Sequence, residues 1–189
     1  MTQPNLDHPT LPLVKQRFPN RRLLATEFRG VTTLIVEPKD VHEVLAFLRD
    51  DPSCRYDLLS DVTCVDYLNY PASKTDNGPI GRFGVIYNLV SIPHNTRLLV
   101  KVFLDPTLDT HGIEEDPALV VPTCTDLWPG AEWREREVFD MFGIRFEGHP
   151  DLRRILLWED YPAHALRKDY PVIGRGEREH YTQLDRDSA

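Results

Sequence analysis

The stretch FGVIYNLVSIPHNTRLLVKVFL, residues 83–104, carries the clearest structural signal in the chain. Two runs rich in aliphatic and aromatic residues, Phe83–Ile92 and Thr96–Leu104, flank the turn-forming triplet Pro93-His94-Asn95. Such runs on either side of a turn are typical of paired β-strands. The polar residues that interrupt the stretch are Asn88, His94, Asn95, Arg97 and Lys101. The stretch therefore predicts two strands joined by a turn, and its apolar runs are too short for a transmembrane helix.

Upstream of this pair the sequence predicts further strands and two helices. Arg22–Phe28 and Val31–Val36 have the composition of strands, and Arg29-Gly30 suits a tight turn between them. A helix is expected from Pro38 to about Arg49, because its apolar residues recur at the i, i+3, i+4, i+7 spacing. These residues are Val41, Val44, Leu45 and Leu48. The other expected elements are a short helix at Pro9–Arg17, at least one strand in Tyr56–Tyr67, and loops at Ala72–Gly81 and Asp105–Pro117.

Hairpins with interspersed helices, rather than strict alternation of strand and helix, suggest an α+β fold with a small mixed or antiparallel sheet packed with helices. The 189 residues fit one domain, or one domain plus an appendage, and 41% hydrophobic residues suffice for a core. A net charge of -8 argues against binding to nucleic acid or directly to anionic lipid. Cys54, Cys64 and Cys124 are too few for a disulfide framework, so reduced thiols in a cytoplasm are expected. The N-terminus resembles neither a signal nor a transit peptide, so membrane association is expected to come through a partner.

The chain changes character near Thr125. Thr125 or Asp126 is expected to cap a helix running through Trp128–Phe142, with Gly143 ending it in a left-handed conformation. Its stripe of residues 131, 135, 138 and 142 is apolar except for Glu135, and a buried carboxylate needs a partner. Arginine has suitable fork-shaped donors. We therefore predict an ionic network, including an i, i+4 pair of Arg136 with Asp140, that fixes the following segment to the helix. Its members are Glu135, Arg136, Glu137, Asp140, Arg153 and Arg154.

Beyond Phe146 the periodicity of helices and strands ends. Pro150, Pro162 and Pro171 each favour extended backbone in the preceding residue. Large apolar residues are interleaved with charges throughout, which is unlike a disordered tail. We therefore expect residues 1–146 to form the α+β domain, including the helix, and residues 147–189 to form an extended arm that docks on a partner. The alternative is that the arm wraps around its own domain.

Motifs for catalysis and cofactor binding are incomplete. His42-Glu43 lacks the second histidine of a zinc pair, because Ala46 occupies its position. Gly174-Arg175-Gly176 follows no clear strand, and Glu179 replaces the third glycine of a dinucleotide motif. An acidic loop is favoured over a metal site for the group of His111, Glu114, Glu115 and Asp116. His149 with Asp151 and His164 with Asp169 could be proton-transfer pairs, although structural hydrogen bonding is favoured. We expect no catalytic, metal-binding or cofactor-binding residues in this chain.

Three blocks resemble the signature of the complex I 30 kDa subunit family. The first runs from Glu135 to Ile144, the second is Phe146–Leu156, and the third is Leu166-Arg167-Lys168-Asp169-Tyr170-Pro171. Trp128-Pro129, Trp133 and the Val65-Asp66-Tyr67 step also resemble the family. The resemblance covers most of the chain and is strongest from Thr125 to Pro171. Departures are Ala165, where the family usually has proline, and Glu132 and Arg134, which replace commoner asparagine and aromatic residues.

The resemblance implies a non-catalytic structural subunit in the peripheral arm of a proton-translocating NADH–quinone oxidoreductase. Its partners would be the 49 kDa-type subunit and the B-type and I-type iron–sulfur subunits. FMN and the iron–sulfur clusters would belong to other subunits, and this chain would hold no cofactor. The complex would place it peripherally on the cytoplasmic side of a bacterial plasma membrane. The interface and signature residues that the resemblance implies are Glu135, Arg136, Glu137, Asp140, Gly143, His149, Pro150, Asp151, Arg153, Arg154, His164, Arg167, Lys168 and Asp169.

Other functions are also compatible with the sequence. The near alternative is the equivalent subunit of a ferredoxin-fed plastoquinone dehydrogenase or of a membrane-bound hydrogenase, because the electron donor is set by other subunits. A distant alternative is a stand-alone metal-dependent hydrolase that uses His149, Asp151 and His164. A free-standing binding adaptor is a third. Co-purifying partners would discriminate among them.

Overall fold

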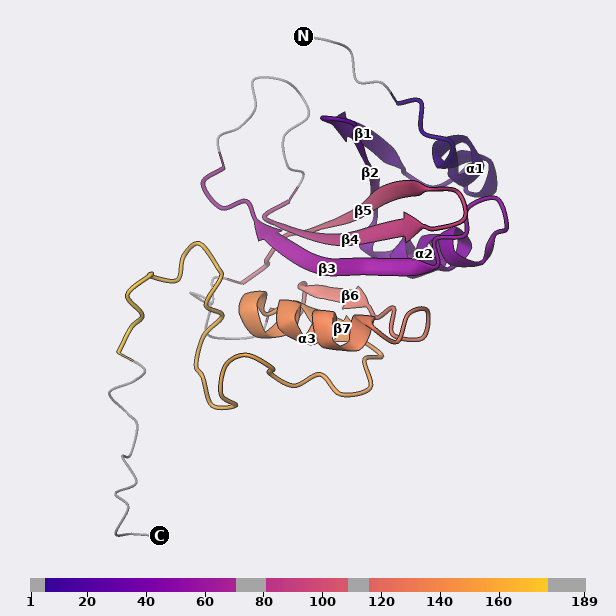
Figure 1. Ribbon diagram of the computed structural model, residues 1–189. Coiled ribbons are helices and arrows are strands. Elements are labelled where there is room, and N and C mark those ends of the chain that lie inside the picture. Colours follow the sequence, from indigo (N-terminus) through magenta and orange to yellow (C-terminus); the bar gives the residue numbers. More distant parts are fainter. Residues whose placement is uncertain (1–5, 71–80, 109–115, 177–189) are drawn as a thin grey trace.

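The computed structural model describes residues 6–70, 81–108 and 116–176. Its centre is a five-stranded sheet in the order β1-β2-β5-β4-β3 (Figure 1). The strands are β1 (Leu24–Phe28), β2 (Val31–Val36), β3 (Leu58–Asp66), β4 (Phe83–Ser91) and β5 (Thr96–Leu104). All neighbouring pairs are antiparallel except β2 with β5, which is parallel. The predicted α+β fold with a mixed sheet is therefore confirmed.

Both predicted turns contain residues with positive φ. Arg29 and Gly30 have φ of 51° and 79°, which is the backbone of a two-residue hairpin turn, and Phe28 pairs with Val31 across it. Asn95, with φ of 50°, lies in the turn between β4 and β5. The predicted loops at residues 72–81 and 105–117 lie largely outside the described residues.

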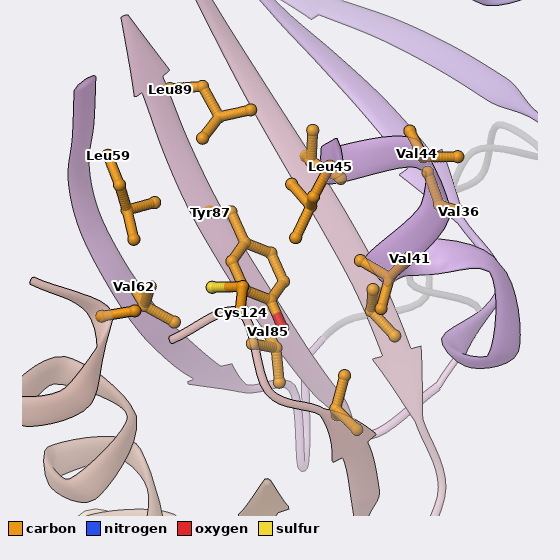
Figure 2. Close-up of a cluster of buried hydrophobic side chains, with 14 of the residues drawn as sticks. Val36, Val41, Val44, Leu45, Leu59, Val62, Val85, Tyr87, Leu89 and Cys124 are labelled. Carbon is orange, nitrogen blue, oxygen red and sulfur yellow. The ribbon is translucent and has the colours of Figure 1, made fainter. Parts of the chain in front are cut away.

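Strands β2, β3, β4 and β5 bury alternate side chains, so the sheet has an inner and an outer face, whereas no side chain of β1 is buried. On β2, β4 and β5 the inner residues, apart from Thr96, are buried, whereas the outer ones, apart from Gly84, are partly or fully exposed. Helix α2 (Val41–Asp50) covers the inner face, and Figure 2 shows its valines and leucine facing those of the strands. The four residues of its predicted apolar stripe are completely buried. The predicted helix start at Pro38 is a short 3-10 helix, η1 (Pro38–Asp40), that leads into α2. The predicted N-terminal helix is α1 (Thr10–Arg17).

The C-terminal third contains two strands that the sequence analysis did not predict. β6 (Val120–Pro122) precedes α3 (Ala131–Phe142) in the sequence and β7 (Arg145–Glu147) follows it. The two strands pair with each other in parallel. The predicted start of α3 at Trp128 and its cap at Thr125 or Asp126 are wrong. Gly130 is the N-cap and makes no side-chain capping bond. The N–H groups of Leu127 and Trp128 both donate to the Cys124 carbonyl, so this segment is a separate turn before the helix.

Residues 148–176 contain no helix or strand and run beside α3 (Figure 1). No helix in the three described segments is long and apolar enough to cross a bilayer. The three cysteines are free and buried. The division at residues 146 and 147 stays a prediction, and the arm is used below as the name for residues 147–176.

Candidate functional site: the junction of helix α3 with the arm

The C-terminus of α3 is capped almost entirely by the arm. Gly143, in the left-handed conformation with φ of 72°, donates its N–H to the Phe139 carbonyl over 2.8 Å. The next three carbonyls of the helix receive donors from the arm, as follows. Asp140 O accepts from Arg154 Nη1 (3.1 Å) and His164 Nδ1 (3.0 Å), Met141 O from Leu166 N (3.1 Å), and Phe142 O from Arg167 Nε (2.6 Å). Helix ends normally leave these carbonyls without intrahelical partners, so the arm completes the helix.

The arm also supplies charge that α3 lacks. The last turn of α3 contains no basic residue, although its C-terminus carries the negative end of the helix dipole. Arg154 and Arg167 bring guanidinium groups to this end, and Arg167 is only 4% exposed. The helix and the arm are therefore complementary electrostatically as well as in hydrogen bonding.

Asp140 is the centre of the junction. Its buried carboxylate accepts from Arg154 Nη1 over 2.7 Å and from the backbone N–H groups of residues 155, 156 and 157 over 3.0, 2.8 and 2.9 Å. Burial alone would raise the pKa of Asp140, but the hydrogen bonds from Leu157, Arg154 and their neighbours outweigh it and lower the pKa. The carboxylate is therefore ionised at neutral pH and holds the arm in a bend around it.

The predicted ionic network divides into separate contacts. Arg136 donates to the carbonyls of Arg153 and Arg154, each over 3.0 Å, and not to Asp140. The i, i+4 pair is wrong because Asp140 points into the junction, where Arg154 meets it. Arg153 forms a surface pair with Asp151. Glu137 is exposed.

Glu135 is buried as the stripe predicted, but its expected arginine partner is wrong. Its carboxyl group accepts from Thr123 Oγ1 (2.5 Å), Cys124 N (2.8 Å) and Cys124 Sγ (3.2 Å). Thr123 and Cys124 follow β6 and face α3 from the sheet side, where Cys124 lies beside Tyr87 (Figure 2). Burial raises the pKa of Glu135, and these hydrogen bonds only partly offset it. No pattern in the sequence pointed to this pairing, because the two residues lie outside any periodic element.

We expect Glu135→Gln to change stability little at neutral pH, because an amide retains an acceptor for Cys124 N–H without a buried charge. Glu135→Ala should lower the free energy of unfolding by about 1–3 kcal/mol, since it leaves the Cys124 N–H and the Thr123 hydroxyl unpaired. Urea unfolding of both variants measures the difference. The pKa of Glu135 is raised in the folded chain, so the wild type should lose stability as the pH rises through that pKa, whereas neither variant should. A glutamine variant that loses as much as alanine would contradict this account.

His149 has a structural position at the start of the arm. Its Nε2 donates to the Glu132 carbonyl over 3.0 Å, and its Nδ1 accepts from the Asp151 N–H over 3.0 Å. The contact with Asp151 is thus to the backbone, not to the carboxylate, so the proton-transfer pair is wrong, and both ring nitrogens of His149 make structural hydrogen bonds within the chain. Pro150 is exposed in the turn between them.

The far end of the arm is fastened to the main sheet. Asp66, at the end of β3, accepts from Lys168 N over 2.8 Å and from Arg82 Nε and Nη2 over 3.1 and 2.9 Å. The same Arg82 Nη2 lies 2.9 Å from Asp169 Oδ2. The proposed pair of His164 with Asp169 is therefore wrong, because Asp169 pairs with Arg82 and His164 with the Asp140 carbonyl. The contact with Asp66 was not predicted, although its strand had been matched to the family signature.

His164 makes the junction sensitive to acid. Burial lowers the pKa of His164 to about 4, so the folded chain holds it neutral while the unfolded chain protonates near its usual 6.5. Stability from this group is thus present above about pH 6.5 and lost as pH falls toward 4, by about 3 kcal/mol over the window. His164→Asn should keep a donor near the Asp140 carbonyl and remove this slope. The free energies of unfolding of wild type and variant are measured in urea between pH 7 and 4. An equal change with pH in both proteins would show that His164 does not titrate in this way.

Known proteins match this chain in sequence and in fold. The profile of the family described as respiratory-chain NADH dehydrogenase, 30 kDa subunit, matches residues 34–176. The C-type subunit of NADH-quinone oxidoreductase from Citrifermentans bemidjiense is 45% identical over 89% of this chain and 91% of its own. The corresponding subunit from Roseiflexus sp. is 42% identical over 88% of this chain and 86% of its own.

Two solved structures are similar to this chain. A trypsin-resistant fragment (1-134) of Nqo5 superposes with a TM-score of 0.56 at 31% identity, covering 75% of this chain and 96% of the fragment. A chain of an archaeal membrane-bound sulfane sulfur reductase superposes with a TM-score of 0.64 over 93% of this chain and 92% of its own. At 21% identity it shows the shared fold alone.

Proposed function

Because the chain belongs to the 30 kDa subunit family of respiratory-chain NADH dehydrogenase, we propose that it is a non-catalytic structural subunit of a proton-translocating NADH–quinone oxidoreductase. In this role it supports electron transfer from NADH to quinone that neighbouring subunits carry out. FMN and the iron–sulfur clusters belong to those neighbours. The observation that carries the proposal is the arm, which the domain holds in a fixed, extended course at both ends.

The arm is built to present side chains outward. Between its two fastenings it buries His164 and Arg167 against α3, at 3% and 4% exposure. Just beyond the second fastening, Val172 and Ile173 are 105% and 96% exposed. Two neighbouring aliphatic side chains that bury nothing on their own chain are candidates for burial on a partner. The arm can therefore pack on its own domain and also dock on a partner, because different residues make the two contacts.

The partners we propose are the 49 kDa-type subunit and the B-type and I-type iron–sulfur subunits of the same complex. The signature residues that fasten the arm, among them Arg136, Asp140, Arg154, Arg167 and Asp169, set its position for docking. Membrane association is indirect, through the complex, on the cytoplasmic side of a bacterial plasma membrane.

Purification of the tagged chain from detergent-solubilised membranes of its host tests this function. Co-purification with the 49 kDa-type and iron–sulfur subunits, together with inhibitor-sensitive NADH–quinone activity, is the expected result. A hydrogenase or a ferredoxin-fed module would indicate the equivalent subunit of a related complex. Recovery of the chain alone would contradict the proposal.

The double variant Val172→Ser/Ile173→Ser should lower the assembled fraction of the chain roughly tenfold or more, because two exposed aliphatic side chains lose their burial on the partner. Native gels of solubilised membranes, with quantification of the tagged chain, measure this fraction. The conservative variant Val172→Leu/Ile173→Leu keeps the apolar surface and should assemble normally. The stability of the isolated chain should not change in either variant, so equal assembly of the serine variant would show that these side chains do not dock.

A further inference from the structure

The outer face of the five-stranded sheet has a pattern unlike that of a solvent-facing surface. Sheets with one solvated face normally alternate apolar inner and polar outer residues. Here the outward residues of the five strands include many apolar side chains that are partly or fully exposed. They are Leu24, Phe28, Val31, Ile35, Leu58, Val65, Ile86, Val90, Leu99 and Phe103. The outer face is therefore apolar enough to pack against another protein layer.

The strand register arranges these residues in rows across the sheet. One row consists of Thr63, Ile86, Lys101, Ile35 and Leu24, and the next, which is mostly polar, of Asp61, Asn88, Leu99, Thr33 and Thr26. Beyond it Leu58, Val90 and Arg97 are paired across β3, β4 and β5, and Val31 is paired with Phe28 across β2 and β1. The two outer rows are mostly apolar, and each carries a single cation on the central strand β5, Lys101 in one and Arg97 in the other. Beside the first row, Leu24, Ile35, Phe103 and Pro38 line a hollow that could receive an apolar side chain, with Arg22 and Glu37 also at its wall.

The chain covers one end of this face itself. The Tyr67 ring lies over Gly84, where an added Cβ would meet it at 2.9 Å, and packs on Phe103 with centroids 5.8 Å apart. Lys101 Nζ donates to the Tyr67 hydroxyl over 3.0 Å, so this cation has a partner. Arg97 is exposed and makes no ion pair with any residue in the described parts of the chain. The remaining face thus combines apolar rows with one cation that needs an acceptor once it is buried.

We propose that the outer face of the sheet is a second docking surface, and that its occupant is an apolar surface of a neighbouring subunit with a carboxylate opposite Arg97. Covering the row that contains Arg97 would remove its guanidinium from water, and a carboxylate offsets that loss best because it accepts two hydrogen bonds from the guanidinium and balances its charge. The cations Arg97 and Lys101 outnumber the one acidic residue of the face, Asp61, in a chain whose net charge is -8. A second copy of the chain would bring two such cationic faces together, and two cations are too few to hold an anionic membrane.

This inference rests on the proposed function, since it names a second contact within the same complex. The test places a photo-crosslinking phenylalanine derivative at position 99, in the centre of the face, in the tagged chain expressed in its host. After irradiation the complex is purified and the crosslinked peptides are identified by mass spectrometry. The expected product joins position 99 to an apolar peptide of another subunit that contains aspartate or glutamate. Arg97→Glu should lower the yield of this product at least roughly tenfold.

Two controls separate loss of this contact from other failures. Lys15→Glu, an equal charge change on the exposed side of α1, should leave the yield unchanged. A second crosslinker at position 173, in the arm of the Arg97→Glu chain, should still react with its own partner, which shows that the variant folds and assembles. A product with a second copy, with lipid only, or with no protein would overturn the inference while co-purification leaves the proposed function intact. Failure of the wild-type chain to co-purify with the complex would remove both.

Discussion

Asp140→Ala is expected to lower the free energy of unfolding by about 3–5 kcal/mol, the range for removing one partner of a buried ion pair. The Asp140 side chain is fully buried and its partner Arg154 is only 14% exposed. Alanine would leave the guanidinium without its carboxylate and three successive backbone N–H groups without an acceptor. Urea unfolding of the full chain, followed by circular dichroism, measures the change. Trypsin should also cleave the arm faster, because its bend around residue 140 is lost.

The same segment offers a matched control. Asp151 pairs with Arg153 through two hydrogen bonds of 2.6 and 2.7 Å, but both side chains are exposed. Exposed pairs contribute little, so Asp151→Ala should leave stability nearly unchanged. Equal losses in the two variants would show that burial of Asp140 does not matter.

Asp140 should stabilise the junction until the pH is strongly acidic, because its pKa in the folded chain is lowered. Its folded pKa is lowered, so its stabilisation is present above the ordinary aspartate pKa near 3.8 and is lost as pH falls through the lower folded value. The His164 effect has already been lost at that point, since it occurs between about pH 6.5 and 4. Acid should therefore loosen the junction in two steps, and Asp140→Asn should abolish the second.

The strands of the main sheet and helix α2 were predictable because local patterns determine them, whereas the strand order with its parallel β2–β5 pair was not predicted. The β4–β5 hairpin follows from two apolar runs around Pro93-His94-Asn95, and the stripe of α2 follows from its helical spacing. Gly143 was correctly expected as a left-handed cap, because a glycine after an apolar helical face is a local signal. β6 and β7 were missed because three residues are too few to show a period.

The contacts of the junction could not be predicted, because they depend on which way each side chain points in three dimensions. Several arginines were available to Glu135 and Asp140, and the sequence gives no measure of their distances. Glu135 faces the sheet side, where only Thr123 and Cys124 reach it, while Asp140 faces the arm and meets Arg154. Of the six predicted network residues only Asp140 and Arg154 form an ion pair with each other, so most of the predicted ionic network was wrong.

One physical requirement connects most of the junction. A helix must satisfy its last carbonyls, and α3 ends against its own domain, where solvent cannot serve all of them. Donors from the arm satisfy these carbonyls, and they belong to Arg154, His164, Leu166 and Arg167. The same hydrogen bonds therefore complete the helix and position the arm. In the docking proposed for the arm, a segment fixed in this way would lose less conformational entropy when the partner binds it.

Gly143→Ala is expected to lower the free energy of unfolding by about 2–5 kcal/mol. The left-handed backbone, with φ of 72°, accounts for about 1–2 kcal/mol of this in a residue with a Cβ. The rest, about 1–3 kcal/mol, comes from overpacking. The added Cβ would lie 2.5 Å from both His164 Nε2 and Arg167 Nη2. Neither side chain can retreat without breaking its bond to the Asp140 or the Phe142 carbonyl.

Gly30→Ala isolates the packing part of this effect. Gly30 has nearly the same backbone, with φ of 79°, but a Cβ there would meet nothing within 4 Å. Its variant should therefore lose only the backbone share, about 1–2 kcal/mol. Trypsin digestion provides a second readout, because displacement of His164 and Arg167 should expose the bonds after Arg167 and Lys168 in the Gly143 variant alone. If the two variants lose equal stability and digest at equal rates, the arm does not depend on close packing at the end of α3, and the junction is held by its ion pairs instead.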